Sequence, residues 1–162
     1  MPKVSQSIKP DRALDRIDRN ILRHLQQDGR LSNVELARRV NLSPSPCLER
    51  VRRLEADGFI EGYSARLNPV KLGLGMEAFI QITLDRTNGD VFDSFREAVV
   101  DILEVAECHM VAGGFDYLLK LRVSDMVAYR NLLGELVDLP GVSQTHTYIV
   151  IDKIKQESGI NL

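Results

Sequence analysis

Apolar residues recur at helical spacing near the start of the chain. The pattern predicts a helix that Asp15 caps and that Gly29 ends. Intervening positions are polar and rich in arginine, as expected of a surface helix with one buried face. The predicted apolar face comprises Leu14, Ile17, Ile21 and Leu25.

A second, shorter helix is expected to follow. Ser32-Asn33-Val34-Glu35 is typical of a capping box, in which the serine hydroxyl and the glutamate carboxylate each accept a backbone N–H of the first turn. The asparagine in Asn41-Leu42 is expected to make a tight break after this helix. The apolar positions expected to face the core are Val34, Ala37 and Val40.

The segment from Ser43 to Leu54 predicts a third helix. Its two prolines are tolerated in a first turn, where backbone N–H groups have no helical partner. Cys47, Val51 and Leu54 share one face, so Cys47 is expected to be a small core residue and not a nucleophile. Pointing away from that stripe are Ser45, Glu49, Arg52 and Arg53, with Arg50 at its flank.

Three short helices with a basic, outward-facing third one favour a winged helix-turn-helix that binds double-stranded DNA. Residues 59–66 alternate like the short hairpin, or wing, of such a domain. The N-terminus of the third helix would suit a DNA phosphate, and Ser45 is small enough for entry into a groove about 12 Å wide. A three-helix bundle with merely solvated arginines remains an alternative. The candidate DNA-binding residues are Arg38, Arg39, Ser43, Ser45, Glu49, Arg50, Arg52 and Arg53.

Charge is distributed unevenly. Residues 1–66 hold 13 Lys and Arg against 9 Asp and Glu, a net charge of +4. Residues 67–162 hold 8 against 14, a net charge of −6, so the total of −2 conceals a basic first part. Phosphate binding depends on local charge, and the two parts therefore indicate different partners.

The second part of the chain predicts an α+β domain. Residues 67–75 contain one proline and two glycines and are expected to form a linker. The following apolar patterns predict the order βαββαβ, a ferredoxin-like sheet with two helices on one face, capped by Asp90 and Ser124. The expected divisions are a flexible arm at 1–13, the DNA-binding domain at 14–66, the ferredoxin-like domain at 76–157 and a tail at 158–162.

The open face of this sheet is expected to carry Phe79 or the residues that alternate with it, together with Met110 and Tyr148, and such a face is too apolar to face water. Coverage by a second copy of the chain is the simplest solution, so we expect at least a homodimer.

The sequence indicates no enzyme, cofactor or metal site. Cys47 and Cys108 form no CxxC pair, and the histidines have no spacing that places two on one helix face. We expect no membrane span and no secretory signal, because long apolar runs are absent. Unpaired cysteines fit a reducing cytoplasm.

Four motifs resemble the leucine-responsive regulatory protein (Lrp/AsnC) family, and the likeness runs from about residue 14 to residue 156. It implies a regulator of transcription that controls genes of amino-acid metabolism, dimerises and assembles to an octamer. It also implies an effector, usually an amino acid, bound between subunits near the turn at 113–116. Met110 and Met126 could supply an adaptable apolar wall there, so leucine or methionine is expected. The motifs are Asp15–Leu22, Ser32–Leu36, Ser43–Glu55 and Asp116–Lys120.

The resemblance places an effector site at Met110, Gly113, Gly114, Asp116, Met126 and Tyr148. Gly114 stands where the family typically has the first acidic residue of the turn. Glycine N–H groups can hold a carboxylate, and the carboxylate of Asp116 can pair with an ammonium group. In the alternative, Asp116 only binds backbone within an ordinary turn, and the domain is an assembly or adaptor module without an effector.

Overall fold

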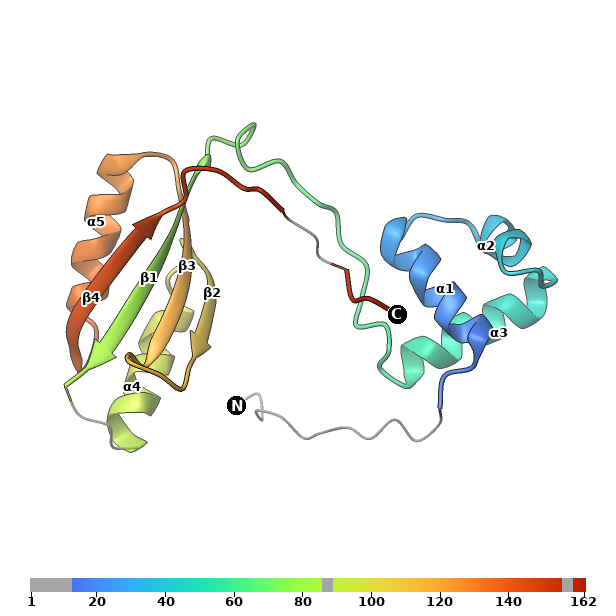
Figure 1. Cartoon of the computed structure of the whole chain (residues 1–162), viewed down its shortest axis with the longest axis horizontal. Coiled ribbons are helices and arrows are strands. Elements are labelled where there is room, and N and C mark those ends of the chain that lie inside the picture. Colours follow the sequence, from blue (N-terminus) through green and yellow to red (C-terminus); the bar gives the residue numbers. More distant parts are fainter. Residues whose placement is uncertain (1–12, 86–88, 156–158) are drawn as a thin grey trace. The chain divides into compact units, whose positions relative to one another are not determined.

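The computed structural model describes residues 13–85, 89–155 and 159–162 (Figure 1). The chain forms two compact units, one built from residues up to Arg66 with the C-terminal residues, and one that begins at Leu67. Nearly all of the expected N-terminal arm, residues 1–12, lies outside the described residues.

The first unit is helical. Its helices are α1 (Arg16–Gln27), α2 (Asn33–Arg39) and α3 (Pro44–Ala56). They bury one shared core, and Cys47 belongs to it as the spacing predicts. Burial raises the pKa of the Cys47 thiol, because the thiolate is disfavoured away from water. The core residues are Ile21, Leu22, Leu36, Ala37, Val40, Cys47 and Leu54.

The first two helices follow the sequence, with one difference in the capping box of α2 and one in its buried face. Asp15 caps α1 as expected, and its carboxylate accepts the N–H of Asp18. Ser32 caps α2 by accepting the N–H of Glu35, but the Glu35 carboxylate binds arginines of α2 and leaves the box half formed. Val34 was expected in the core and is 67% exposed, because the apolar face of α2 is set by Leu36, Ala37 and Val40.

The segment after α3 differs from the expected hairpin. Residues 59–66 form no strand, consistent with the marginal stability of an isolated two-stranded hairpin. Tyr63 fixes this segment by donating its hydroxyl hydrogen to Glu55 Oε1 at 3.0 Å. The C-terminal residues also join this unit: the Gln26 side chain exchanges two hydrogen bonds with the backbone of Ile160.

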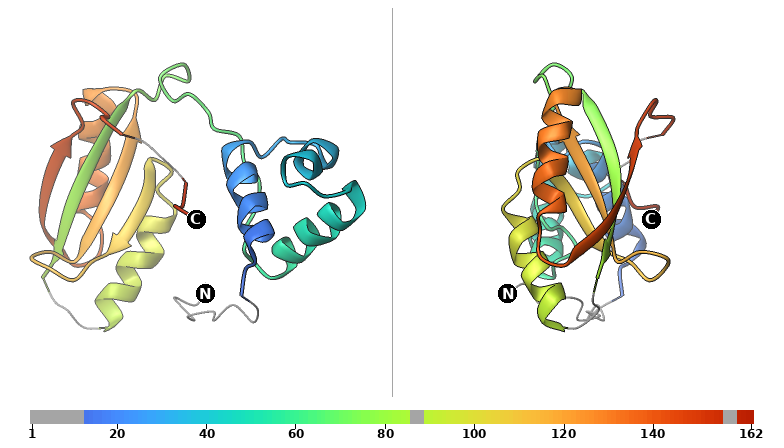
Figure 2. Two further views of the ribbon diagram at one scale, coloured as in Figure 1. Left: turned by 45° about the vertical axis from the view of Figure 1, so that its right-hand side comes forward. Right: turned by 90° about the vertical axis from the view of Figure 1, so that its left-hand side faces the viewer.

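The second unit has the predicted ferredoxin-like fold. Its elements are β1 (Met76–Leu84), α4 (Gly89–Val100), β2 (Val105–Met110), β3 (Tyr117–Val123), α5 (Met126–Val137) and β4 (Val142–Ile149). The strands form an antiparallel sheet in the order β2-β3-β1-β4, and both helices lie on one face (Figure 2).

The core of this unit lies between the sheet and its two helices. Ile80 and Ile82 of β1 are fully buried against Phe95 of α4 and Leu136 of α5. The helix starts correct two expectations: α5 is capped by Asp125 and not by Ser124, and Asp90 lies within the first turn of α4. Asp125 is the N-cap of α5 because its carboxylate accepts two N–H groups, from Val127 and Ala128.

Candidate nucleic-acid interface and effector site

The turn between α2 and α3 is tightly specified. Asn41 takes a left-handed conformation with φ of 56°, which asparagine tolerates better than most residues. The Asn33 side-chain amide donates to the carbonyl of Pro44 at 2.7 Å and so ties the start of α2 to the first turn of α3. These two features hold the short turn between α2 and α3 in place.

The first turn of α3 offers fewer donors than the sequence suggested. Pro44 and Pro46 carry no N–H, and the N–H of Cys47 donates to the carbonyl of Ser43. The N–H of Ser45 is therefore the donor that this turn can present to a phosphate. The Ser43 side chain forms no capping hydrogen bond, so its hydroxyl can also donate outward.

One face of α3 is open to solvent. At about 100° per residue, Ser45, Glu49 and Arg52 fall within roughly 60° of one another. All three are exposed, and within the described part of the chain Arg52 forms no ion pair. Leu48, which the sequence reasoning missed, flanks this face and is 37% exposed. The exposure of Leu48 could have been predicted from its position between Cys47 and Glu49, off the buried stripe.

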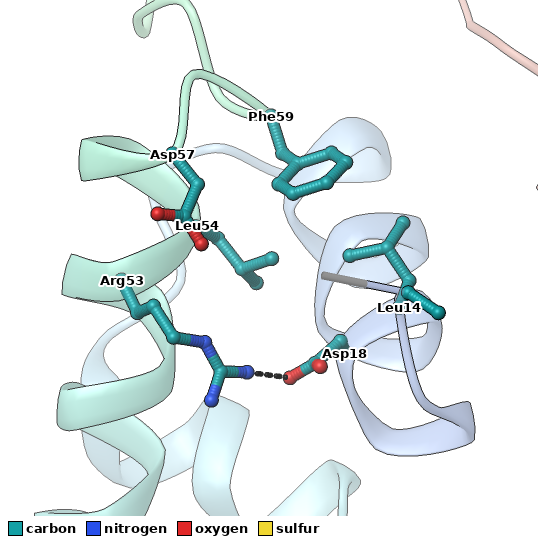
Figure 3. A pocket seen from close by; sticks show the side chains of 7 residues that line it. Leu14, Asp18, Arg53, Leu54, Asp57 and Phe59 are labelled. Atoms are coloured by element: carbon teal, nitrogen blue, oxygen red, sulfur yellow. Dashed lines mark hydrogen bonds and ion pairs between the residues drawn. The ribbon is translucent and has the colours of Figure 1, made fainter. Parts of the chain in front are cut away.

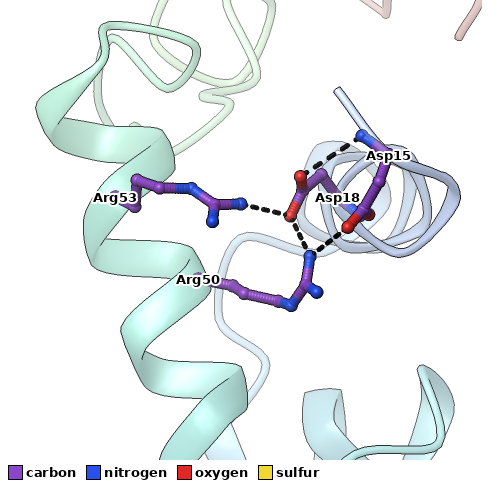
Figure 4. Close-up of polar contacts among 4 residues, drawn as sticks. All are labelled: Asp15, Asp18, Arg50 and Arg53. Carbon is purple, nitrogen blue, oxygen red and sulfur yellow. Dashed lines mark hydrogen bonds and ion pairs between the residues drawn. The ribbon is translucent and has the colours of Figure 1, made fainter. Parts of the chain in front are cut away.

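Arg50 and Arg53 lie differently from Arg52. Arg50 Nη1 donates to Asp15 Oδ2 at 2.6 Å and to Asp18 Oδ1 at 2.7 Å, and Arg53 Nη2 donates to Asp18 Oδ1 at 2.8 Å (Figure 4). Asp18 is 4% exposed. The expected outward direction of Arg53 is thus not observed, because a buried carboxylate on α1 draws it inward.

A shallow hollow adjoins this ion-pair cluster. Arg53, Asp18 and Leu54 line it together with Leu14, Asp57 and Phe59 (Figure 3). Its volume is about 10 Å³, the space of roughly one water molecule. It is too small for an amino-acid effector.

The arginines of α2 are also paired. Arg38 forms two hydrogen bonds with the Glu35 carboxylate, and Arg39 Nε donates to Glu35 Oε1 at 2.8 Å. The two arginines hold the pKa of Glu35 at about 2. Arg38 stays 73% exposed, so its pairing leaves the guanidinium accessible.

Acid is expected to weaken the link between α1 and α3. The N–H of Asp18 and the guanidinium of Arg50 lower the pKa of Asp15 from 3.8 to about 2. A depressed pKa contributes stability that is complete above about pH 4 and is lost as the pH falls toward 2. We expect Asp15→Asn, which preserves the cap, to lower the thermal midpoint equally between roughly pH 5 and 8, and by less below pH 4. A loss that stays constant down to pH 3 would contradict the assignment.

Asp116 is held by backbone groups. Its Oδ2 accepts the N–H of Leu84 at 2.8 Å, its N–H donates to the carbonyl of Ile82 at 2.9 Å, and its carbonyl accepts the N–H of Val111. The carboxylate is therefore fixed at the end of β1. In the described residues its second oxygen, Oδ1, has no hydrogen-bond partner.

Met110 lies on the helix side of the sheet, which corrects its expected place on the open face. It pairs with Tyr117, whose ring packs against Phe95 of α4 with centroids 4.5 Å apart. Arg96 of α4 also donates to the Met110 sulfur at 3.5 Å. A bulge between Val105 and Glu107 interrupts the pairing of β2 with β3, so the side chains of β2 do not alternate regularly between the two faces.

The other expected effector residues are not brought together within one chain. The turn at 113–116 adjoins the Ile82 end of β1, whereas Met126 follows the strand end that pairs with Met76 (Figure 1). Tyr148 pairs with Phe79 on the open face and is 53% exposed. These residues can line one site only if more than one subunit contributes.

Gly113 and Gly114 are not required by the backbone. Neither has a positive φ, and a Cβ added at either would meet nothing within 4 Å. The backbone of the turn is thus open to an approach from outside the chain.

Residues 14–61 match winged helix-turn-helix DNA-binding domains, and residues 77–160 match the Lrp/AsnC ligand binding domain. The leucine-responsive regulatory protein of Klebsiella pneumoniae is 58% identical over 96% of this chain and 95% of its own length. That of Serratia marcescens is 60% identical over 93% of this chain and 92% of its own length. The chain belongs to the Lrp/AsnC family. This confirms the resemblance, the α+β fold and the role as a DNA-binding regulator of transcription, in a family that is not enzymatic.

Solved structures of Lrp/AsnC relatives agree. A transcriptional regulator from Neisseria meningitidis, in complex with L-methionine, has a TM-score of 0.88 at 39% identity, over 92% of this chain and 97% of its own. The feast or famine regulatory protein of M. tuberculosis, also with L-methionine, has a TM-score of 0.83 at 37% identity, over 91% of this chain and 99% of its own.

The described residues include no helix long and apolar enough to cross a membrane.

Proposed function

We propose that α3 enters the major groove of double-stranded DNA and reads it with Ser45, Glu49 and Arg52. The open face that these residues share carries the proposal. An unpaired arginine can donate two hydrogen bonds to a guanine, and Glu49 can accept from a cytosine amino group. Leu48 at the margin of the face can contact a thymine methyl group.

Phosphate contacts would set the position of α3 in the groove. The Ser45 N–H and the Ser43 hydroxyl lie at the start of α3, where the helix dipole favours an anion. Arg38 and Arg39 of α2 supply positive charge, although Glu35 neutralises part of it. Such contacts bind every sequence alike and fix the register of the base contacts.

The salt dependence of DNA binding tests this function. Logarithmic affinity for duplex DNA should fall linearly with logarithmic salt concentration, by about 0.9 for each phosphate contact. Fluorescence anisotropy with labelled duplexes at several salt concentrations measures the slope. An adaptor that uses the same helices for a protein partner would show no DNA affinity at any salt concentration.

We propose further that the second unit assembles the protein as a homodimer and then an octamer. Support comes from the open face of the sheet, where Phe79 is half-buried and Tyr148 is 53% exposed on adjacent strands. A second copy would remove these side chains from water and place two α3 helices on one DNA molecule.

The effector is proposed to be an amino acid, methionine or leucine, bound near Asp116 between subunits. Asp116 Oδ1 can accept a hydrogen bond from the ligand ammonium, and the open backbone at 113–114 can receive its carboxylate. Exposed Met110 and Met126 from different subunits would supply an adaptable apolar wall. Two relatives were solved with L-methionine. A regulator of amino-acid metabolism genes in the cytoplasm fits such an effector.

A further inference from the structure

We infer that Arg50 and Arg53 are positioning residues, which hold α3 against α1 through Asp15 and Asp18 and do not contribute their charge to DNA. The inference rests on the proposed function of α3. It concerns the clamp, defined here as the side chains of Asp15, Asp18, Arg50 and Arg53.

The clamp joins two helices that are otherwise held mainly by apolar contacts. Asp18 Oδ1 accepts from Arg50 and from Arg53, one turn apart on α3, so one carboxylate fixes two points along that helix. Its other oxygen, Oδ2, accepts the N–H of Asp15 and so also closes the first turn of α1. Rotation of α3 about its axis would break both arginine contacts together.

Burial makes this carboxylate dependent on its partners. The side chain of Asp18 is 5% exposed, whereas those of Arg50 and Arg53 are 26% and 35% exposed. A buried carboxylate that loses its cations is strongly unfavourable, so the native orientation of α3 is the one that keeps both arginines in place.

The clamp is electrically neutral as a whole, because two carboxylates face two guanidinium groups. Counterion release on DNA binding follows the phosphate charge that a protein neutralises. Cations already neutralised by Asp15 and Asp18 contribute little to it. Arg52, on the same helix and without an ion pair in the described chain, is the contrasting case.

Replacing Asp18 gives results of opposite sign for the two possible roles. If Arg50 and Arg53 bound phosphates, Asp18→Asn would remove a negative charge and free two cations, so affinity would rise and the salt slope would steepen by up to about 2. If they position α3, the variant misorients the reading face. Affinity for a selected operator should then fall, on the order of tenfold, with the slope unchanged within about 0.5.

Three further variants distinguish the two roles of the arginines without relying on Asp18→Asn alone. Asp15→Asn keeps the cap of α1 and removes only the second acceptor of Arg50, so it should weaken binding less than Asp18→Asn, and in the same direction. Arg53→Gln should weaken binding without changing the slope, whereas Arg52→Gln should change the slope or the sequence preference. Circular dichroism checks that each variant is helical before its affinity is measured.

The measurement is anisotropy with one operator duplex at four salt concentrations, for the parent and the four variants. Weaker binding of Asp18→Asn and Asp15→Asn at an unchanged slope supports the positioning role. Tighter binding of either helical variant with a steeper slope overturns it. A parent protein without salt-dependent DNA binding would instead overturn the proposed function, while urea unfolding of Asp18→Asn still reports the clamp.

Discussion

Arg52→Ala is expected to weaken operator binding by ~1–3 kcal/mol, roughly 5- to 150-fold. The reason is that Arg52 is the unpaired arginine on the open face of α3, beside Ser45 and Glu49. If Arg52 reads a base, preference should relax at one operator position, and if it binds a phosphate, all sequences should weaken alike. Anisotropy with the operator and with single-base variants separates the two cases.

Arg19→Ala is the matched control. It removes the same charge from an exposed position on α1, outside the open face of α3. A small, sequence-independent loss is expected for this variant. Equal losses for Arg19→Ala and Arg52→Ala would show that only overall charge matters, and parent-like binding by Arg52→Ala would refute the assignment of the reading face.

Asp116→Asn is expected to reduce methionine binding at least tenfold while the fold is preserved. The asparagine carbonyl can still accept the N–H of Leu84, which Asp116 Oδ2 accepts at 2.8 Å. The charge that would pair with the ligand ammonium is lost, and a charged hydrogen bond contributes about 1.5–3 kcal/mol. Titration calorimetry with methionine and leucine measures the effect.

Asp116→Ala is the companion variant, because it also leaves the Leu84 N–H without its partner. We expect it to lower the thermal midpoint as well as ligand affinity. Methionine binding that is unchanged in Asp116→Asn would assign Asp116 a purely structural role and move the ammonium site elsewhere. If the parent binds no amino acid, the second unit is an assembly module, consistent with Gly114 in place of an acidic residue.

The architecture was largely predictable from the sequence, because it depends on periodic burial. Spacing of apolar residues located α1, α3 and the βαββαβ order, and Cys47 was correctly placed in the core. The residues that cap the helices were harder to predict. Asp125 outcompetes its neighbour Ser124 for the cap of α5, and spacing alone cannot decide between adjacent candidates.

Side-chain pairing between distant segments could not be predicted. Arg53 lies on the outer half of α3 by helical spacing, yet Asp18, 35 residues earlier, binds it. Met110 changes face because of a bulge between β2 and β3, which leaves no clear mark in the sequence. The assignment of arginines to DNA or to the clamp therefore required the structure.

Selection from a pool of random duplex DNA tests the central claim most directly. The parent protein at physiological salt should enrich sequences with two similar half-sites in inverted orientation, their centres about 10 base pairs or a multiple apart. That spacing follows from the proposed homodimer, in which a two-fold axis would relate two copies of α3. Recovered sequences indistinguishable from the starting pool would contradict sequence-specific DNA recognition through α3.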